Sequence, residues 1–330
     1  MEQYLIDILE QTKDNIIVSD AFTKADSVIN NPKYKNIVCS ISGGADSDVM
    51  LDLIYKVDKD KKVRYVWFDT GLEYQATKNQ LIYLEQRYGI QIERIRAEKT
   101  IPLCCKQIGQ PFLSKQISEN LANLQKHNFD FKDGDYAELL AKYPKCTYTI
   151  RWWCNASDTD MYNISYRPYL KEFLISNPPK FKISKMCCYY TKKKLSHKLD
   201  CDLQITGIRR AEGGVRRTAY KNCYDTHTDK RDNYRPLFWF SNSDKEYYEQ
   251  KFGIIHSDCY KVWGFVRTGC VGCPYSIALN KKSDLSIAKH YEPNLVLACE
   301  NIFKDSYEYT KAYKQFALDM KNKDKNKKKL

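Results

Sequence analysis

The sequence predicts an α/β fold in which helices flank a twisted parallel sheet. Three short apolar segments, at 37–41, 63–68 and 91–95, alternate with helical patterns at 46–57 and roughly 75–88. Strand, helix, strand, helix, strand at this spacing is typical of parallel strands joined by right-handed crossovers. The chain has 330 residues, of which 43% are hydrophobic and 29% charged, so it can bury a core and is not disordered throughout.

The remaining segments extend this prediction on both sides. Residues 1–35 form a helical leader with apolar residues at helical spacing. The middle, about 101–180, is rich in aromatic residues and mostly helical by pattern, and a strand at 203–206 precedes a loop rich in glycine and arginine. A helix is expected over 243–251, with Ser243 and Glu246 in capping-box register.

Three domain boundaries follow from these patterns. We expect one nucleotide-binding domain over 36–276, a helical C-terminal segment over 277–320 and a disordered basic tail over 321–330. The tail holds six lysines and one aspartate, a net charge of +5, so the rest of the chain keeps +8 of the total of +13. Such a tail is most often solvated, whereas the remaining +8 favours a phosphate-rich substrate or a polyanionic partner.

Composition also excludes several classes of protein. No run approaches the roughly 18 apolar residues of a spanning helix, so a membrane protein is not expected. The first residues carry acids and no apolar core of a secretory signal. The 13 cysteines, an odd number, favour reduced thiols or metal ligands in a cytoplasmic protein over a disulfide scaffold.

A glycine-rich turn, Ser42–Ser47, lies between the first strand and its helix. Two glycines permit a tight turn that exposes N–H groups, the helix adds its positive end, and the hydroxyls of Ser42 and Ser47 add donors. These features predict an anion cradle, although a tight turn without a ligand is the alternative. The sequence SGGADS resembles the SGGxDS PP-loop of N-type ATP pyrophosphatases and adenylyl-sulfate reductases, which bind ATP or a sulfonucleotide there.

Two further segments extend the resemblance. Residues 68–74, FDTGLEY, are similar to the DTGxEY element after the family's second strand. Residues 206–216, TGIRRAEGGVR, resemble the arginine-rich TGxRxxES element, except that Gly213 stands where serine is usual. Guanidinium groups bind phosphate with paired hydrogen bonds, so we expect this loop to clamp the nucleotide, with a merely solvated loop as the alternative.

Two cysteine motifs carry the last part of the resemblance. Cys187 and Cys188 are adjacent, and Cys270 and Cys273 form a CxxC pair before a proline. Adjacent ligands suit an iron–sulfur cluster better than a zinc knuckle. CCYYTK and GFVRTGCVGCP resemble the CCxxxK and GxxRxGCxxCP elements that hold a [4Fe–4S] cluster in adenylyl-sulfate reductases and related DNA-sulfur-modification enzymes. Zinc and unligated thiols remain alternatives.

The other cysteines carry no such signal. Cys104, Cys105, Cys146 and Cys154 also combine a pair with two single residues, but they match no motif and are expected to be buried free thiols.

The resemblance implies an adenine nucleotide alpha hydrolase-like domain in the cluster-bearing branch of the phosphoadenylyl-sulfate and adenylyl-sulfate reductase family. It implies catalytic roles for Asp46, Asp69 and Lys192, metal ligation by Cys187, Cys188, Cys270 and Cys273, and Mg²⁺ on the phosphates. The nucleotide contacts that it implies are Ser40, Ser42, Gly43, Gly44, Asp46, Ser47, Asp69, Thr70, Gly207, Arg209, Arg210 and Arg216.

The absence of one motif helps to choose among the activities that the resemblance allows. Sulfonucleotide reductases of this family use a cysteine in a C-terminal Glu-Cys-Gly-(Ile/Leu)-His segment, which this sequence lacks, and Cys299 is spaced like the inward face of a helix. We therefore expect an ATP pyrophosphatase that adenylates a substrate for sulfur or nitrogen transfer. The basic charge and 26 tyrosines are compatible with a nucleic-acid substrate, and a sulfur- or electron-donor protein is the expected partner. A reductase releasing sulfite and a non-enzymatic nucleotide-binding regulator are the alternatives.

Overall fold

The computed structural model describes residues 2–213, 218–226, 231–279 and 284–327. The chain forms two compact units, each assembled from two stretches of sequence. The first unit comprises Met1–Ala97 and Lys192–Cys270, and the second comprises Glu98–Thr191 and Val271–Leu330.

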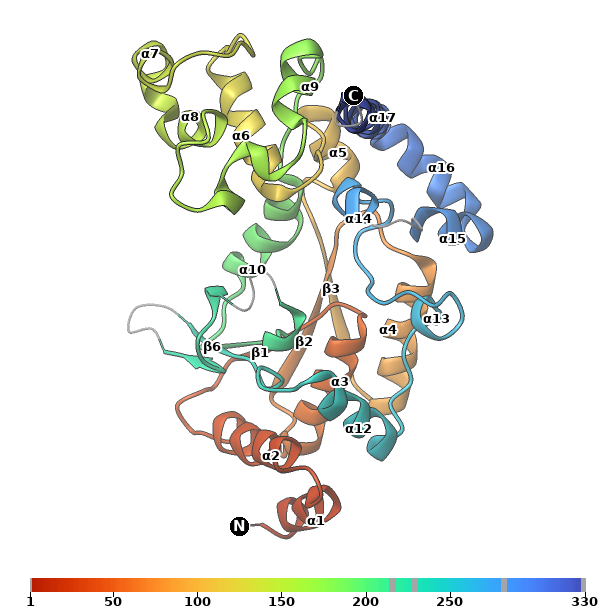
Figure 1. Cartoon of the computed structure of the whole chain (residues 1–330). Helices are drawn as coiled ribbons and strands as arrows, with labels where there is room; N and C mark the ends of the chain where they lie inside the picture. Colours follow the sequence, from red (N-terminus) through yellow and green to blue (C-terminus); the bar gives the residue numbers. More distant parts are fainter. Residues whose placement is uncertain (1, 214–217, 227–230, 280–283, 328–330) are drawn as a thin grey trace. The chain divides into compact units, whose positions relative to one another are not determined.

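The first unit is built on a mostly parallel sheet, which confirms the predicted fold class (Figure 1). Its described strands follow the order β3-β2-β1-β4-β6-β5, and β5 alone runs antiparallel to its neighbour. In the centre, Ile37 is in register with Val63 on one side and Leu203 on the other. The strands are β1 (Ile37–Ile41), β2 (Val63–Asp69), β3 (Ile92–Arg96), β4 (Leu203–Thr206), β5 (Tyr224–Asp225) and β6 (Asp232–Tyr234).

Helices cover this sheet because each places apolar residues on one side. In the second helix the buried residues Val18, Ala21, Phe22, Ala25 and Ile29 follow a spacing of three to four, which is one face of an α-helix. The expected helical leader thus belongs to the core of the first unit. The helices of this unit are α1 (Gln3–Thr12), α2 (Ile16–Ile29), α3 (Ala45–Val57), α4 (Gln75–Tyr88), α10 (Lys194–Lys198), α12 (Asn242–Phe252) and α13 (Asp258–Lys261).

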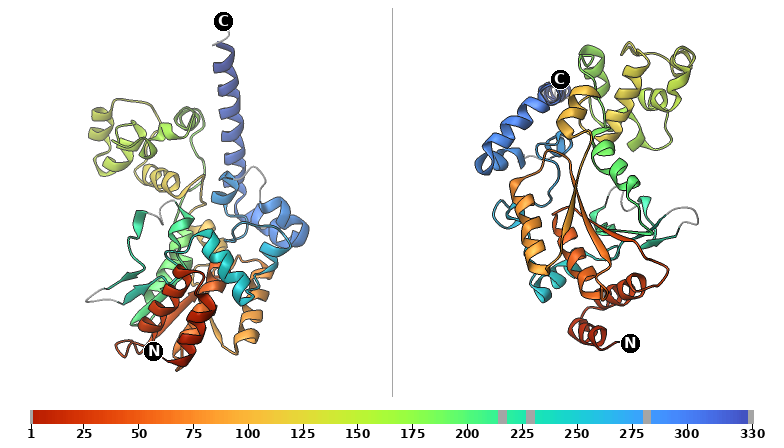
Figure 2. Two further views of the ribbon diagram at one scale, coloured as in Figure 1. Left: turned by 60° about the horizontal axis from the view of Figure 1, so that its bottom comes forward. Right: turned by 180° about the vertical axis from the view of Figure 1, so that it is seen from behind.

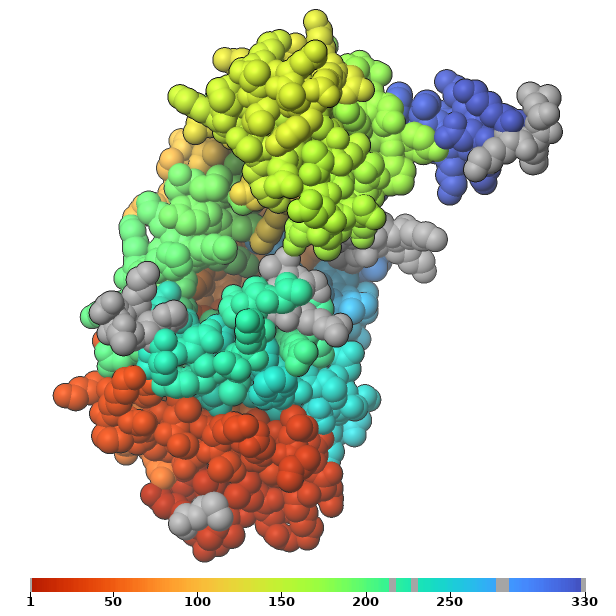
Figure 3. Space-filling model, turned by 60° about the vertical axis from the view of Figure 1, so that its left-hand side comes forward, coloured from red at the N-terminus to blue at the C-terminus, as the bar shows by residue number. Residues whose placement is uncertain are grey.

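The chain between α2 and β1 is joined to β6 by polar contacts. Lys33 Nζ lies 2.7 Å from Asp232 Oδ2, and the Tyr34 hydroxyl donates to the same carboxylate over 2.5 Å. Accordingly, N-terminal residues and the segment around Asp232 lie side by side on the face shown in Figure 3.

The start of α12 differs from the sequence-based prediction. Ser241, rather than Ser243, caps the helix: its Oγ accepts the N–H of Asp244 over 3.1 Å, and the Asp244 carboxylate accepts the N–H of Ser241 over 2.9 Å. The capping box expected at Ser243 and Glu246 is therefore wrong by two residues. Asp244 also accepts a hydrogen bond from Asn15 over 2.9 Å, a contact that favours the earlier start.

The second unit is helical, as the pattern predicts. Its core is aromatic, with Phe112, Trp152, Trp153 and Phe173 almost fully buried, and α17 adds Tyr309 and Tyr313 to the same cluster. In Figure 2, α17 is the long dark-blue helix. The α-helices are α5 (Ile101–Gln107), α6 (Lys115–Lys126), α7 (Tyr136–Lys142), α8 (Thr147–Trp153), α9 (Leu170–Ser176), α14 (Pro274–Leu279), α15 (Asp284–Tyr291), α16 (Pro293–Ile302) and α17 (Lys304–Lys327).

The basic tail also differs from the prediction. Residues 321–327, expected to be disordered, continue α17 as far as Lys327, and 328–330 lie outside the described residues. The segment holds no glycine or proline, and lysines in the last turn interact favourably with the helix dipole. The Tyr169 hydroxyl, which donates to Asp324 Oδ2 over 2.6 Å, links this turn to the rest of the unit.

None of the described helices is both long enough and apolar enough to cross a lipid bilayer.

The revised cap makes a testable prediction for stability. Replacing Ser241 with alanine should lower the free energy of unfolding by about 1 kcal/mol, because the Asp244 N–H loses its acceptor. Ser243→Ala is the matched control and should change it by only a few tenths of a kcal/mol. Urea denaturation followed by circular dichroism measures both values. A larger loss for Ser243→Ala than for Ser241→Ala would contradict this assignment.

Candidate functional site

The turn after β1 has the geometry of an anion-binding loop. Gly43 has a φ of +67°, and a Cβ built there would lie 2.6 Å from Cγ2 of Thr77, so the turn requires glycine. Ser47 Oγ donates to the Gly44 carbonyl over 2.9 Å and accepts the Ser42 N–H over 3.2 Å. The Gly44 N–H donates to Ser42 Oγ over 3.3 Å. The two hydroxyls that the sequence assigns to the ligand thus also hold the shape of the loop.

The loop leads directly into the N-terminus of α3. Ala45 is the first residue of this helix, so its N–H has no acceptor within the helix. It donates to the Tyr260 hydroxyl over 3.1 Å. The aligned peptide dipoles of α3 make this end positive, which favours an anion.

An ion pair joins this loop to the loop after β4. Arg209 is 7% exposed, and its Nε donates to Asp46 Oδ1 over 2.9 Å. Its Nη1 donates to the Ser241 carbonyl over 3.2 Å and to Asn242 Oδ1 over 3.1 Å. Burial raises the pKa of Asp46, and the Arg209 charge opposes that rise. Arg209, predicted as a phosphate clamp, therefore also fixes Asp46.

The loops after β1 and β4 approach each other closely at the point where the strand order of the sheet reverses. A Cβ at Gly207 would lie 3.3 Å from the Asp46 carbonyl oxygen, so a larger residue would push the two backbones apart by a few tenths of an ångström. β1 pairs with β2 on one side and with β4 on the other. In open α/β sheets, ligands bind at the carboxyl ends of strands where the order diverges in this way.

Two other predicted contacts have different surroundings. Arg210 is exposed, and its guanidinium lies 5.6 Å from the centre of the Trp239 ring. Ser40, on β1, accepts a hydrogen bond from Gln204 over 3.0 Å. Arg216 lies outside the described residues.

The segment after β2 supplies the next part of the site. Asp69 Oδ1 accepts the Gly71 N–H over 2.8 Å, and the Thr70 hydroxyl donates to Glu73 over 2.7 Å. Burial raises the pKa of Glu73, and the nearby charge of Lys192 opposes that rise. The predicted catalytic residues Asp46, Asp69 and Lys192 thus all belong to the first unit. Their roles remain predictions.

Residues 256–270 form a segment whose contacts with the loops after β1, β2 and β4 were not predicted from the sequence. Tyr260 contacts Ala45, the Arg267 guanidinium lies 3.4 Å from the Glu212 carboxylate, and Cys270 Sγ lies 4.0 Å from Thr70 Oγ1. The segment therefore reaches the loops that follow β1, β4 and β2. Only its cysteine motif was visible in the sequence, because its partners are distant in the chain.

Further ring contacts anchor the 256–270 segment. Trp263 and Phe265 pack against the buried Tyr74 ring, with centroid distances of 5.4 and 5.6 Å. Tyr74 belongs to the DTGLEY element, so the anchor lies beside a predicted nucleotide contact.

A buried histidine holds the beginning of this segment. His256 bridges two carboxylates, with Nδ1 2.8 Å from Asp48 Oδ2 and Nε2 2.6 Å from Glu249 Oε1. Burial raises the pKa of Asp48 to about 6, against the opposing effect of His256. Burial alone would lower the pKa of His256, but its hydrogen bonds to Asp48 and Glu249 outweigh that effect and raise it to about 9.

The cysteines of the second unit gather in one neighbourhood. A hydrogen bond with the Cys188 thiol and burial raise the pKa of Cys187, and the thiols of Cys105 and Cys273 lie near enough to add to that rise. Burial also raises the pKa of Cys273 to about 11 and that of Cys105 to about 12. Three of the four predicted ligands, and Cys105 with them, thus lie near enough to affect one another's pKa.

The fit to a metal cluster is partial in this structure. Cys270 is the last residue of the first unit, whereas Cys187, Cys188 and Cys273 belong to the second. Within the described residues, no three His, Cys, Asp or Glu side chains are arranged to hold a metal ion. The soft thiol donors suit an iron–sulfur cluster, and its binding remains a prediction.

Cys299 lies in the core of the second unit, as predicted. It is fully buried, and its thiol donates to the Val271 carbonyl over 3.5 Å. Burial raises its pKa to about 12, which opposes formation of a thiolate nucleophile.

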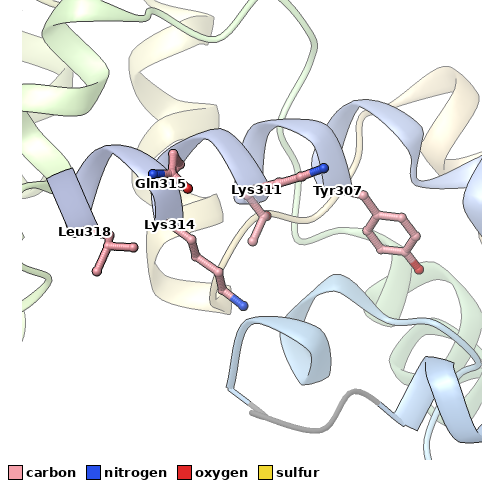
Figure 4. Close-up of a pocket in the computed structure, with 6 residues that line it drawn as sticks. Tyr307, Lys311, Lys314, Gln315 and Leu318 are labelled. Atoms are coloured by element: carbon pink, nitrogen blue, oxygen red, sulfur yellow. The ribbon is translucent and has the colours of Figure 1, made fainter.

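A hollow of about 380 Å³ runs along α17 and contains none of the predicted site residues. A single helix provides all of its lining, with the polar ends of Lys311, Lys314 and Gln315 beside Tyr307 and Leu318 (Figure 4).

One part of the chain matches a known protein family. Residues 36–126 match the phosphoadenosine phosphosulfate reductase domain, which confirms over these residues the resemblance inferred from the motifs. An uncharacterized protein of Methanocaldococcus jannaschii is 25% identical over 271 residues, or 82% of this chain. The match spans 42% of the length of that relative.

Solved structures with related folds are distant in sequence. The phosphoadenylyl-sulfate reductase of Candida auris, in a phosphate complex, is 14% identical, with 82% of this chain and 96% of that chain covered and a TM-score of 0.39. The U34-tRNA thiolase of Methanococcus maripaludis, with its [4Fe–4S] cluster, is 14% identical, with 91% and 80% covered and a TM-score of 0.37.

The His256 bridge makes stability dependent on pH. The pKa of His256 rises from 6.5 unfolded to about 9 folded, so its contribution is complete below pH 6.5 and is lost as the pH rises through 9. Between pH 7 and 10 the free energy of unfolding of the wild type should fall by roughly 2 kcal/mol more than that of His256→Gln. Chemical denaturation across this range measures the difference.

His290→Gln, which replaces an exposed histidine, is the control and should follow the wild type. Equal pH dependence in the wild type and His256→Gln would show that the bridge does not carry the effect.

Proposed function

We propose that this chain, whose residues 36–126 belong to the phosphoadenosine phosphosulfate reductase domain family, is an ATP pyrophosphatase-type enzyme that activates a substrate for sulfur or nitrogen transfer. The observation that carries the proposal is the meeting of the loops after β1 and β4. The Arg209–Asp46 pair and the approach of Gly207 bring a glycine turn, a helix N-terminus and an arginine-bearing loop to one switch point. These are the elements that hold a polyphosphate.

The proposed chemistry is transfer of an adenylyl group. A substrate oxygen attacks the α-phosphorus of ATP, the bond from that phosphorus to the bridging oxygen breaks, and pyrophosphate leaves. A sulfur or nitrogen nucleophile then displaces AMP from the adenylated substrate. The loop N–H groups and arginines would stabilise the leaving charge, and Mg²⁺, which favours carboxylate oxygens, would be bound near Asp46 and Asp69.

The proposed cofactor is a [4Fe–4S] cluster on Cys187, Cys188, Cys270 and Cys273. The approach of three of these thiols within the second unit supports the ligand set. Such a cluster supplies electrons, sulfur or structural support when bound.

A second function is favoured by the family match. Members of a reductase family act on sulfonucleotides, so the same loops could hold adenylyl sulfate or its phosphorylated form, with release of sulfite. That reaction needs a reactive thiolate. The deep burial of Cys299 disfavours this residue for the role. A regulator that binds nucleotide without turnover is the third hypothesis.

One experiment separates these functions. Anaerobically purified protein is incubated with labelled ATP or labelled sulfonucleotide, with and without added DNA or RNA. Release of pyrophosphate supports the adenylating enzyme, release of sulfite supports the reductase, and binding without either supports the regulator. Asp46→Asn, whose amide oxygen can still accept from Arg209, should fold and lose turnover. Absence of binding to both nucleotides would overturn the proposal.

Arg210 provides a test of the phosphate clamp. Its exposed guanidinium can form two parallel hydrogen bonds to phosphate, which an ammonium cannot, so Arg210→Lys should weaken ATP binding about tenfold. The melting temperature without ligand should not change. Arg64→Lys is the control, since Arg64 is exposed near the opposite end of β2 and pairs with Glu93. Isothermal titration calorimetry measures the affinities, and equal values for both variants would exclude Arg210 from the site.

The cluster proposal predicts iron content. Protein purified without oxygen should be brown, with about four irons per chain. Cys188→Ser and Cys270→Ser should each bleach it, because each removes one thiolate ligand. Cys201→Ser, in the first unit and outside both motifs, is the control and should keep its iron. Zinc at one per chain, with no iron after anaerobic reconstitution, would refute the cluster.

A further inference from the structure

The Tyr260 hydroxyl lies at a point on which hydrogen-bond donors converge. Its oxygen accepts the Ala45 N–H over 3.1 Å and the Thr268 N–H over 3.3 Å, and it lies 2.8 Å from Thr268 Oγ1. These groups come from two segments more than 200 residues apart in the chain, the nucleotide loop and the 256–270 segment. A single oxygen atom thus satisfies donors from both.

The surroundings of this oxygen suit an anion better than a phenol. Ala45 opens the 13-residue helix α3, so its N–H points out from the positive end of the helix. A Cβ at Gly44 would lie 3.2 Å from the Tyr260 oxygen and 3.3 Å from Thr268 Oγ1, so both atoms lie directly against the glycine turn. Hydrogen bonds to charged oxygens are roughly twice as strong as those to neutral ones, so a phosphate oxygen is the stronger acceptor here.

We propose that the Tyr260 hydroxyl occupies the position of a phosphate oxygen, and that a bound polyphosphate displaces it and takes over the N–H groups of Ala45 and Thr268 together with the Thr268 hydroxyl. This inference rests on the proposed nucleotide-binding function and deepens it. It makes Thr268, which lies in the cysteine motif, a direct phosphate contact. Tyr260 then competes with every ligand for the same hydrogen-bond donors, so a ligand with little negative charge binds weakly.

Displacement of Tyr260 would leave the rest of the 256–270 segment attached. His256 remains bound to Asp48 and Glu249, and Phe265 remains packed on Tyr74. Contacts other than those of the Tyr260 hydroxyl therefore anchor the segment that carries Thr268.

The test is binding of inorganic pyrophosphate and of ATP to the full chain by isothermal titration calorimetry. Tyr260→Phe removes the competing oxygen and should tighten pyrophosphate binding about threefold to tenfold. In the Tyr260→Phe background, Thr268→Val should weaken pyrophosphate binding by a similar factor, because the ligand then loses the hydrogen bond from the Thr268 hydroxyl and keeps only the Thr268 N–H. Tyr247→Phe is the control, since its hydroxyl contacts the Gln11 carbonyl at 3.5 Å, and its affinity should equal that of the wild type.

The outcomes separate this inference from the proposed function. Unchanged or weaker pyrophosphate binding in Tyr260→Phe, with melting temperatures equal to the wild type, would overturn the inference and leave nucleotide binding in place. A wild type that binds ATP and pyrophosphate normally while Thr268→Val has no effect in either background would contradict the proposed contact of the Thr268 hydroxyl with the phosphate. Failure of the wild type and all variants to bind either probe would overturn the proposed function and this inference with it.

Discussion

The ion pair between Arg209 and Asp46 is the interaction on which the site depends. An almost fully buried guanidinium requires a partner, because an unpaired charge in the interior costs several kcal/mol. Asp46 supplies that partner from the first turn of α3, and the carbonyl of Ser241 and the amide of Asn242 satisfy Nη1. The requirement to pair one buried charge thus brings together three segments that are far apart in sequence.

The 256–270 segment has a complementary role, since it connects the nucleotide loops with the cysteine motif. At its start, His256 shares two carboxylates, and the raised pKa keeps the ring charged at neutral pH, so the bridge is ionic. At its end, Cys270 lies beside Thr70. Thr268, the proposed phosphate contact, and Cys270, a predicted cluster ligand, therefore belong to a single anchored stretch of chain.

Sequence patterns were sufficient to predict those features of the fold that depend on residues close together in the chain. The alternation of strands and helices and the glycine turn were predicted because hydrophobic period and backbone freedom are local properties. The cap of α12 was not, because Ser241 and Ser243 both precede an acidic residue by three positions, and the choice depends on Asn15. The hydrogen bond from Tyr169 to Asp324 in the tail joins residues 155 apart, and the Tyr260 contact joins residues 215 apart. Such contacts arise from tertiary packing and leave no periodic signal.

The hydrogen bonds within the glycine turn bear on which ligands it can accept. The N–H groups of Ser42, Gly44 and Ala45 already have acceptors, all of them neutral hydroxyl oxygens. The loop is therefore organised before any ligand arrives, and little conformational entropy is lost on binding. A ligand gains only the difference between its own hydrogen bonds and those that it replaces. A neutral ligand gains almost nothing by this exchange, whereas a phosphate gains charge-assisted bonds and the favourable helix dipole. If the loop binds its ligand as proposed, selectivity for polyanions is expected to come from the hydroxyl groups that occupy the loop as well as from the positive charges around it.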